Sequence, residues 1–258
     1  MNRRSRWLWI AAVVAYAFLY APLIIVVAYS FNDSRLNAEW VGFTFSWYGK
    51  LFHNEKMLQA AWNSLLIGIT ASAVSTVFGT MAGYAMYRFR IRLLPLLILA
   101  PIAIPEILMG VSLLIFFVLL NISLGMISII LSHIAFCIGF VAIVVRSRLA
   151  GMDESLTEAA RDLGATPWKA FRLVTLPLIM PGVVAGALMA FTLSIDDFVI
   201  TFFTAGVGVS TLPLQIYSMI KIAVTPEVNA VSTLLMLLTL GMITLAGRLA
   251  PDALRGKG

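Results

Sequence analysis

The sequence contains few of the residues that carry chemistry. Its 258 residues include one cysteine, Cys137, and two histidines, His53 and His133. A single cysteine excludes an intrachain disulfide and a thiolate metal cluster, and neither histidine has a second ligand at metal-binding spacing. We therefore predict no metal site. Both histidines are expected to be structural, and Cys137 is expected to be a small buried hydrophobic residue.

Two functional classes lack their sequence signals. The chain has no G-x-x-x-x-G-K-[ST] phosphate loop, so it is not expected to bind ATP in the manner of P-loop proteins. An intramembrane enzyme would need a nucleophile–base pair or a metal set, and His133 has no evident partner in the sequence. We therefore predict that the chain has no catalytic residue and no cofactor of its own.

Charge is also scarce, because 12% of the residues are charged whereas 61% are hydrophobic and the mean hydropathy is +0.97. Soluble domains carry about 25% charged residues. Long runs without Asp, Glu, Lys or Arg reach the roughly 20 residues that cross a bilayer. These runs predict an all-α membrane protein with one transmembrane domain over residues 1–258 and spans near 8–30, 61–86, 93–119, 125–145, 178–204 and 229–248. The first run is longer than a signal peptide's apolar core, so we expect it to remain as a span.

The distribution of basic residues predicts the orientation. Fourteen Lys and Arg fall in the two termini and the loops on one side, and four fall on the other. Since cytoplasmic loops hold the excess, both termini are expected in the cytoplasm, which agrees with six spans. The basic residues are spread over short loops and form no single face, so nucleic-acid binding is not expected.

Two local patterns concern helix packing and bending. The motifs Gly79–Gly83 and Gly182–Gly186 have the small-residue spacing that lets helices approach closely in lipid. Pro101 and Pro105 fall within the third span, where each removes a backbone donor. That span is therefore expected to be kinked or partly unwound near the middle of the membrane.

The cytoplasmic loop 146–176 predicts a helical elbow. Ser155 and Glu158 have the spacing of a capping box. Gly164 is expected to end the first short helix, and Thr166 with Pro167 is expected to begin the second. An amphipathic elbow of this kind is typical of a docking element, and the alternative is a helix that caps the bundle or lies on the headgroups.

Three acidic residues lie in or beside the apolar runs, namely Glu106, Asp196 and Asp197. Charges in the membrane are costly and therefore mark functional candidates. Neighbouring residues on a helix point about 100° apart, so one aspartate can face a cavity while the other caps a broken helix or meets another subunit. No Lys or Arg in these runs compensates them, which favours a cation, a proton or water as their companion. Carboxylates satisfied by Ser, Thr or backbone donors are the alternative.

The elbow resembles the EAA loop of ABC importer permeases. The residues that match are Glu158, Ala159, Ala160, Gly164, Val174, Leu176 and Pro177, with Val174 where the family pattern has Ile. The resemblance implies a type I importer bundle with six transmembrane helices and a cytoplasmic coupling helix. It also implies that an ATP-binding subunit dimer, which holds ATP and Mg²⁺, receives this helix in a groove.

The resemblance extends over nearly the whole chain to spermidine/putrescine permeases. The stretches that carry it include Phe191–Phe198, Thr211–Pro213, Ile216–Met219 and Thr225–Ala230. It implies a bacterial inner-membrane complex with a second related permease as heterodimer partner, the ATP-binding subunits and a periplasmic polyamine-binding protein. Aromatic faces can hold ammonium groups, so Trp47, Tyr84 and Tyr217 join the three acidic residues as pathway candidates, although such residues are more often interfacial anchors.

Two alternatives to a polyamine importer remain at this point. Related permeases carry ferric iron, thiamine or other small solutes. A secondary transporter driven by protons, with Glu106 or an aspartate as the relay, is the alternative from another class.

Overall fold

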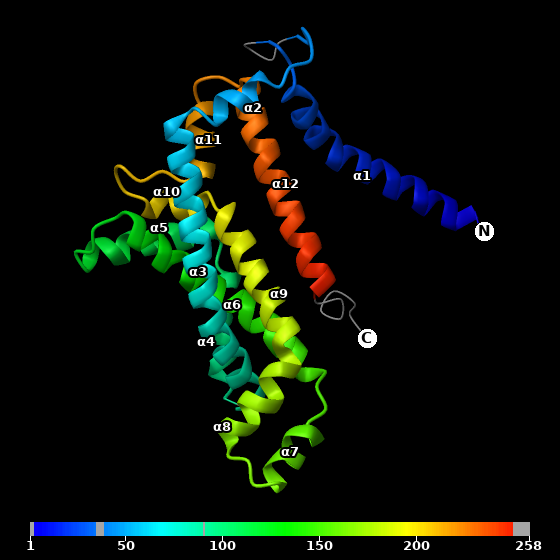
Figure 1. Cartoon of the computed structure of the whole chain (residues 1–258), viewed down its shortest axis with the longest axis vertical. Coiled ribbons are helices and arrows are strands. Elements are labelled where there is room, and N and C mark those ends of the chain that lie inside the picture. The colour runs from blue at the N-terminus through cyan, green and yellow to red at the C-terminus, as the bar shows by residue number, and fades with distance from the viewer. Residues whose placement is uncertain (1–2, 35–38, 90, 250–258) are drawn as a thin grey trace. The chain divides into compact units, whose positions relative to one another are not determined.

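The computed structural model describes residues 3–34, 39–89 and 91–249, and the regular structure in these ranges is helical apart from one β-bridge between Asn32 and Phe43 (Figure 1). This confirms the all-α prediction. The helices are α1 (Arg3–Tyr29), α2 (Ser46–Leu51), α3 (Glu55–Arg88), α4 (Leu93–Ala103), α5 (Glu106–Leu119), α6 (Met126–Ala150), α7 (Ser155–Asp162), α8 (Pro167–Ala170), a π-helical turn η1 (Phe171–Thr175), α9 (Leu176–Ile195), α10 (Val199–Thr204), α11 (Leu212–Ile220) and α12 (Pro226–Leu249).

Five helical segments of the described ranges are long and apolar enough to cross a membrane, and the bent pair α4–α5 makes a sixth if it counts as one span. The five are Trp7–Tyr29, Glu55–Arg88, Met126–Ala150, Pro167–Ile195 and Pro226–Arg248. Each predicted span therefore overlaps one of these segments or, for the third span, the bent pair α4–α5. The helices α3 and α6 extend beyond the apolar runs, because a helix continues into its polar flanks while its backbone hydrogen bonds are satisfied.

The predicted kink in the third span is confirmed. The axes of α4 and α5 differ by 103° across the break between Ala103 and Glu106. Ile104 is extended, with φ −81° and ψ 133°, as a residue before proline tends to be. Pro105 then stands directly before α5, where its missing N–H removes no helical hydrogen bond.

The prediction of one continuous fifth span over 178–204 is wrong. The helix begins earlier, at Pro167, and α9 ends at Ile195; α10 begins only at Val199. The break falls at the two aspartates, because the Asp197 carboxylate accepts the N–H of Ile200 at 3.4 Å and that of Thr201 at 2.8 Å. It thereby caps a new helix. A cap on a broken helix is one of the three alternatives that the sequence leaves open for the aspartates.

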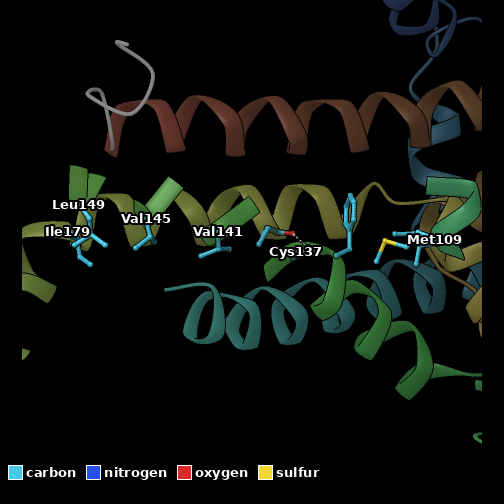
Figure 2. Packing of buried hydrophobic residues seen from close by; sticks show 9 residues of the cluster. Met109, Cys137, Val141, Val145, Leu149 and Ile179 are labelled. Carbon is cyan, nitrogen blue, oxygen red and sulfur yellow. Dashed lines mark hydrogen bonds between the residues drawn. The ribbon is translucent and has the colours of Figure 1, made fainter. Parts of the chain in front are cut away.

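The chain forms two compact units, of which one comprises Met1–Leu58 and Gln215–Leu238 and the other comprises Gln59–Leu214 and Thr239–Gly258. The core of the second unit follows α6. Cys137, Val141, Val145 and Leu149 of α6 have no exposed surface and pack with Ile179 of α9 (Figure 2). The prediction that Cys137 is a buried hydrophobic residue is confirmed.

Both predicted small-residue motifs are packing sites. A Cβ atom at Gly79 would lie 2.5 Å from Cβ of Val141, and one at Gly83 would lie 2.8 Å from the carbonyl oxygen of Ala142, so α3 packs directly on α6. On α9, a Cβ at Gly186 would lie 3.2 Å from Val141. Gly79 and Gly186 thus let α3 and α9 approach α6 closely around Val141.

Candidate functional site

The elbow, formed by α7, α8 and the loop between them, has the predicted turn. Gly164 has φ +86°, and two hydrogen bonds close the end of α7: Gly164 N to Arg161 O at 2.9 Å and Ala165 N to Ala160 O at 3.0 Å. This is a Schellman motif, which explains the glycine. The Thr166 hydroxyl then accepts the N–H of Lys169 at 3.3 Å, with Pro167 at the first helical position. The predicted end of the first helix and start of the second are confirmed.

The predicted capping box of Ser155 and Glu158 does not form. Glu154 is already helical, and its carbonyl accepts the N–H of Glu158 at 3.1 Å. The start of α7 is instead served by Asp153, whose carboxylate accepts the N–H of Ser155 at 3.0 Å. Hydrogen bonds from the side chain and the backbone N–H of Ser155 hold the pKa of Asp153 below its usual value.

The residues of the EAA pattern lie in the elbow, between the end of α6 and the start of α9, and in the first turn of α9 (Figure 1). Glu158, Ala159 and Gly164 are exposed, Ala160 is half-buried, and Leu176 and Pro177 form the first turn of α9. Large apolar side chains project beside them: Leu163 is 90% exposed and Trp168 is 67% exposed. A loop that displays apolar side chains beside charges on one surface is suited to binding another protein.

The inner side of the elbow contacts the end of α3. The Tyr87 hydroxyl donates a hydrogen bond to Glu154, and the ring of Tyr84 meets that of Phe171 with centroids 4.9 Å apart. A cavity of about 170 Å³ lies here, lined in part by Tyr84, Tyr87, Arg88, Glu158 and Arg161.

Tyr84 therefore lies at the elbow and far from the three acidic candidates. The 20 residues of α9 separate the elbow from Asp196, which is about 30 Å along a helix. Tyr84 does not join the acidic residues in one site.

A buried polar network surrounds Asp197. Its Oδ2 accepts the Thr201 hydroxyl at 2.8 Å and lies 3.3 Å from Nε2 of His133. Nε2 is also 2.9 Å from the Thr201 hydroxyl oxygen, and Nδ1 of His133 is 2.7 Å from the hydroxyl of Ser194. The side chains of His133 and Asp197 are only 2% and 6% exposed. With the imidazole proton on Nε2, each of these groups has a partner, and the network ties α6 to both sides of the α9–α10 break.

Asp196 and Glu106 differ from Asp197 because both are exposed. Asp196 ends α9 and Glu106 begins α5, and the two carboxylates are close enough for their charges to interact. The helices α5 and α10 pack together, since a Cβ at Gly110 would lie 2.6 Å from the ring of Phe203. This contact brings the two helix breaks to one place. The C-terminal ends of α4 and α9 and the N-terminal ends of α5 and α10 meet at these breaks, so partial charges of both signs lie there.

Trp47 and Tyr217 belong to the other compact unit, and each already carries a lysine on its ring. Nζ of Lys50 lies 3.9 Å from the ring centroid of Trp47, and Nζ of Lys221 lies 4.7 Å from that of Tyr217. Trp47 is also 9% exposed, and its Nε1 donates to the carbonyl oxygen of Asn32 at 2.8 Å. Its observed contacts are structural.

Sequence reasoning missed the role of His133 as the partner of Asp197. His133 carries no fixed charge as Lys and Arg do, and it lies 64 positions from Asp197 in the chain, so no local spacing links the two residues. A histidine in an otherwise charge-free span is itself a signal, because it needs partners for both ring nitrogens. Among the described residues, no group of three His, Cys, Asp or Glu side chains is placed to hold a metal ion.

Comparison with known proteins gives a consistent result. Residues 75–254 match the family described as "Binding-protein-dependent transport system inner membrane component". The chain is 44% identical over 244 residues to the spermidine/putrescine transport system permease protein PotC of Escherichia coli strain K12, covering 93% of this chain and 92% of the relative. It is 41% identical over 257 residues to the putrescine transport system permease protein PotI of the same strain, covering 96% and 90%.

Solved structures show the same fold. A bacterial ABC transporter that imports the acidic polysaccharide alginate has a TM-score of 0.69 at 18% identity, covering 96% of this chain and 98% of that one. The MetNI methionine ABC transporter in an inward-facing conformation has a TM-score of 0.66 at 24% identity, covering 78% and 100%. The expected importer permease bundle is thereby confirmed as the fold.

Proposed function

The chain belongs to the family of binding-protein-dependent transport system inner membrane components, and on that premise we propose that it forms the translocation path for polyamines in an ATP-driven importer. We name spermidine and putrescine as the substrates because the relatives with over 40% identity are named as permeases for these polyamines. A periplasmic binding protein delivers the polyamine, and a second related permease completes the path as a heterodimer partner. The termini face the cytoplasm, as the excess of basic residues on that side favours.

The observation that carries the substrate class is the exposed carboxylate pair of Glu106 and Asp196 at two adjoining helix breaks. Polyamines are apolar chains with ammonium ends, and charge-assisted hydrogen bonds to carboxylates suit those ends. Transporters commonly bind ions where helices are broken and carbonyl groups are free. Neither carboxylate pairs with a basic side chain of the described residues, so both are available to a cation.

Asp197 has a different role in this proposal. Its carboxylate is buried and holds α10 in place through Thr201 and His133. It shapes the pathway and does not contact the polyamine. Trp47, Tyr84 and Tyr217 are weaker pathway candidates, because their ring contacts are with residues of this chain.

The elbow supplies the coupling to ATP. Glu158, Ala159, Ala160 and Gly164 form the coupling helix and its turn, and Leu176 with Pro177 passes the motion into α9. The partner ATP-binding dimer holds ATP and Mg²⁺, and closure of that dimer moves the elbow. The exposed Leu163 and Trp168 side chains support such docking.

The test is ATP-dependent uptake of labelled spermidine and putrescine into proteoliposomes that hold the complete transporter. Asp196→Asn and Glu106→Gln should each reduce uptake strongly without changing assembly. The matched control is Asp33→Asn, which removes an exposed carboxylate from the loop after α1.

Three outcomes would contradict parts of the proposal. Uptake by this chain alone, without the ATPase, would favour the proton-driven alternative. ATP-dependent uptake of ferric iron or thiamine in place of polyamines would retain the importer and reject the substrate. Undiminished uptake by both carboxylate variants would reject the acidic pathway.

A further inference from the structure

The loop after α1 carries an exposed aromatic patch that the transport function leaves unexplained. We define the aromatic patch as Phe31, Trp40, Val41, Phe43 and Phe45. Four of its five side chains are exposed by half or more: Trp40 by 51%, Val41 by 67%, Phe43 by 64% and Phe45 by 65%. Apolar groups gathered in this way mark a surface that something covers.

The patch is rigid. The centroids of the Phe31 and Phe43 rings are 5.1 Å apart, and those of Phe31 and Phe45 are 5.3 Å apart. The backbone holds this arrangement, since Thr44 N donates to Phe31 O at 2.7 Å. The fully buried Asn32 side chain donates to Glu39 O at 2.8 Å and accepts Val41 N at 2.9 Å. The backbone of the loop is therefore held in place, and the three phenylalanine rings pack on one another.

The position of the patch follows from α1, which lies in the same compact unit. The apolar segment Trp7–Tyr29 has 23 residues, or about 34 Å of helix, against a hydrocarbon thickness of about 30 Å. Tyr29 therefore lies at the membrane boundary. The turn that follows keeps the chain close, because Phe31 N donates to Ala28 O at 3.1 Å. The Trp40 ring meets that of Tyr29 with centroids 6.0 Å apart.

We propose that the aromatic patch is inserted in the headgroup region of the outer leaflet and fixes the depth of this loop in the bilayer. The headgroup region on each side is roughly 5–8 Å thick. This thickness is comparable to the 6.0 Å between the ring centroids of Tyr29, at the end of α1, and Trp40 of the patch. Trp and Tyr rings are enriched in this region, and here Trp40 of the patch meets Tyr29 at the end of α1. Trp7 and Trp9, both exposed, provide aromatic anchors at the other end of the same helix.

A lipid surface accounts for the patch better than a docking protein does. The polar atoms of the neighbouring aromatic residues are used within the loop, because the Tyr48 hydroxyl lies 2.7 Å from that of Ser30 and the Trp47 N–H is bound to Asn32. Apart from the indole N–H of Trp40, the side chains of the patch have no polar atoms to offer a protein. The patch would also remain in water whenever a periplasmic binding protein departed, whereas lipid covers it at all times.

Depth-dependent fluorescence quenching tests the proposal. In a Cys137→Ala background, Phe43→Cys is labelled with an environment-sensitive fluorophore, and the complete transporter is reconstituted in phosphatidylcholine vesicles. Nitroxide lipids labelled at the headgroup should quench this probe more than lipids labelled near the chain end. A probe at Val14→Cys, in the middle of α1 and 61% exposed, should show the reverse order. Aqueous iodide should quench the probe on the Phe43→Cys variant weakly, with or without the binding protein.

Each other result would overturn the proposal. Quenching by iodide alone would place the patch in water, and protection that appears only when the binding protein is added would make it a docking surface. Resistance to both lipid and aqueous quenchers would place it against another subunit. If Phe43→Cys fails to assemble, Phe45→Cys provides the same test.

Discussion

Replacing His133 with alanine tests whether the buried network holds the α9–α10 break in place. The imidazole is 2% exposed and has Ser194, Thr201 and Asp197 within 3.3 Å. Its removal leaves the Asp197 carboxylate, itself 6% exposed, without its partner on α6. Loss of a hydrogen bond to a charged group costs about 1.5–3 kcal/mol, and a buried hydroxyl without a partner costs about 1–3 kcal/mol. We expect a total loss near the lower end of this sum, about 3 kcal/mol, because Asp197 keeps its bonds to Thr201.

The assay is thermal unfolding of the assembled transporter in detergent, together with polyamine uptake. Cys137→Ala is the matched control, because Cys137 lies one turn further along α6 and is equally buried but makes only a weak 3.5 Å contact from its thiol to Ala190 O. It should cost on the order of 1 kcal/mol. His133→Ala should lower both the unfolding temperature and the uptake rate well below those of the control.

A double-mutant cycle decides whether the two residues act on each other. Asp197→Asn, His133→Leu and the double variant should give an interaction energy of about 0.5–3 kcal/mol, as residues in one hydrogen-bond network do. The double variant should be less damaged than the sum of its parts, because it leaves no buried charge without a partner. Strictly additive losses would refute the reasoning, and so would a His133→Ala variant as stable as the control.

Three further predictions concern other parts of the chain. Gly79→Leu should destabilise the protein by about 1–3 kcal/mol or more, because the larger side chain overpacks against α6. The control Gly241→Leu should be close to neutral, because no atom lies within 4 Å of the Cβ position at Gly241. Equal unfolding temperatures of the two variants would contradict the packing role of Gly79. Tyr87→Phe removes the hydrogen bond to Glu154, which connects the elbow to α3. If this bond restrains the elbow, the variant should hydrolyse ATP faster in the absence of substrate, measured on the purified complex. An unchanged rate of ATP hydrolysis would mean that the bond does not restrain the elbow. Glu106→Gln should leave thermal stability unchanged or raise it by a few tenths of a kcal/mol through relief of repulsion while uptake falls; a variant that loses stability and uptake together would indicate a structural role.

The local features of the fold were predictable because their causes lie close together in the sequence. Pro105 predicts the break of the third span, and Gly164 predicts the end of α7, since each acts on its own neighbours. The break at Asp196 was not located, because it depends on where the Asp197 side chain points. The capping box at Ser155 was wrong for a similar reason, since Asp153 competes for the same donors and the sequence does not rank them.

The candidate site was predictable in its residue types and not in its pairing. The cost of acidic residues in lipid identifies Glu106, Asp196 and Asp197 without a structure. Their division into exposed and buried carboxylates depends on His133, which comes from a helix more than 60 residues away in the chain. Contacts between helices decide such pairings, and periodicity in one helix contains no information about them.

The division of the two aspartates is itself an argument for a cationic substrate. A protein that only needed to break a helix could do so with Asp197, whose charge is held by His133 and by donors on α10. Asp196 adds a second carboxylate next to the first and close to Glu106, which raises the repulsion at the break. Within the described residues no basic side chain offsets it. In the proposed function, the positively charged substrate offsets the Asp196 carboxylate during transport.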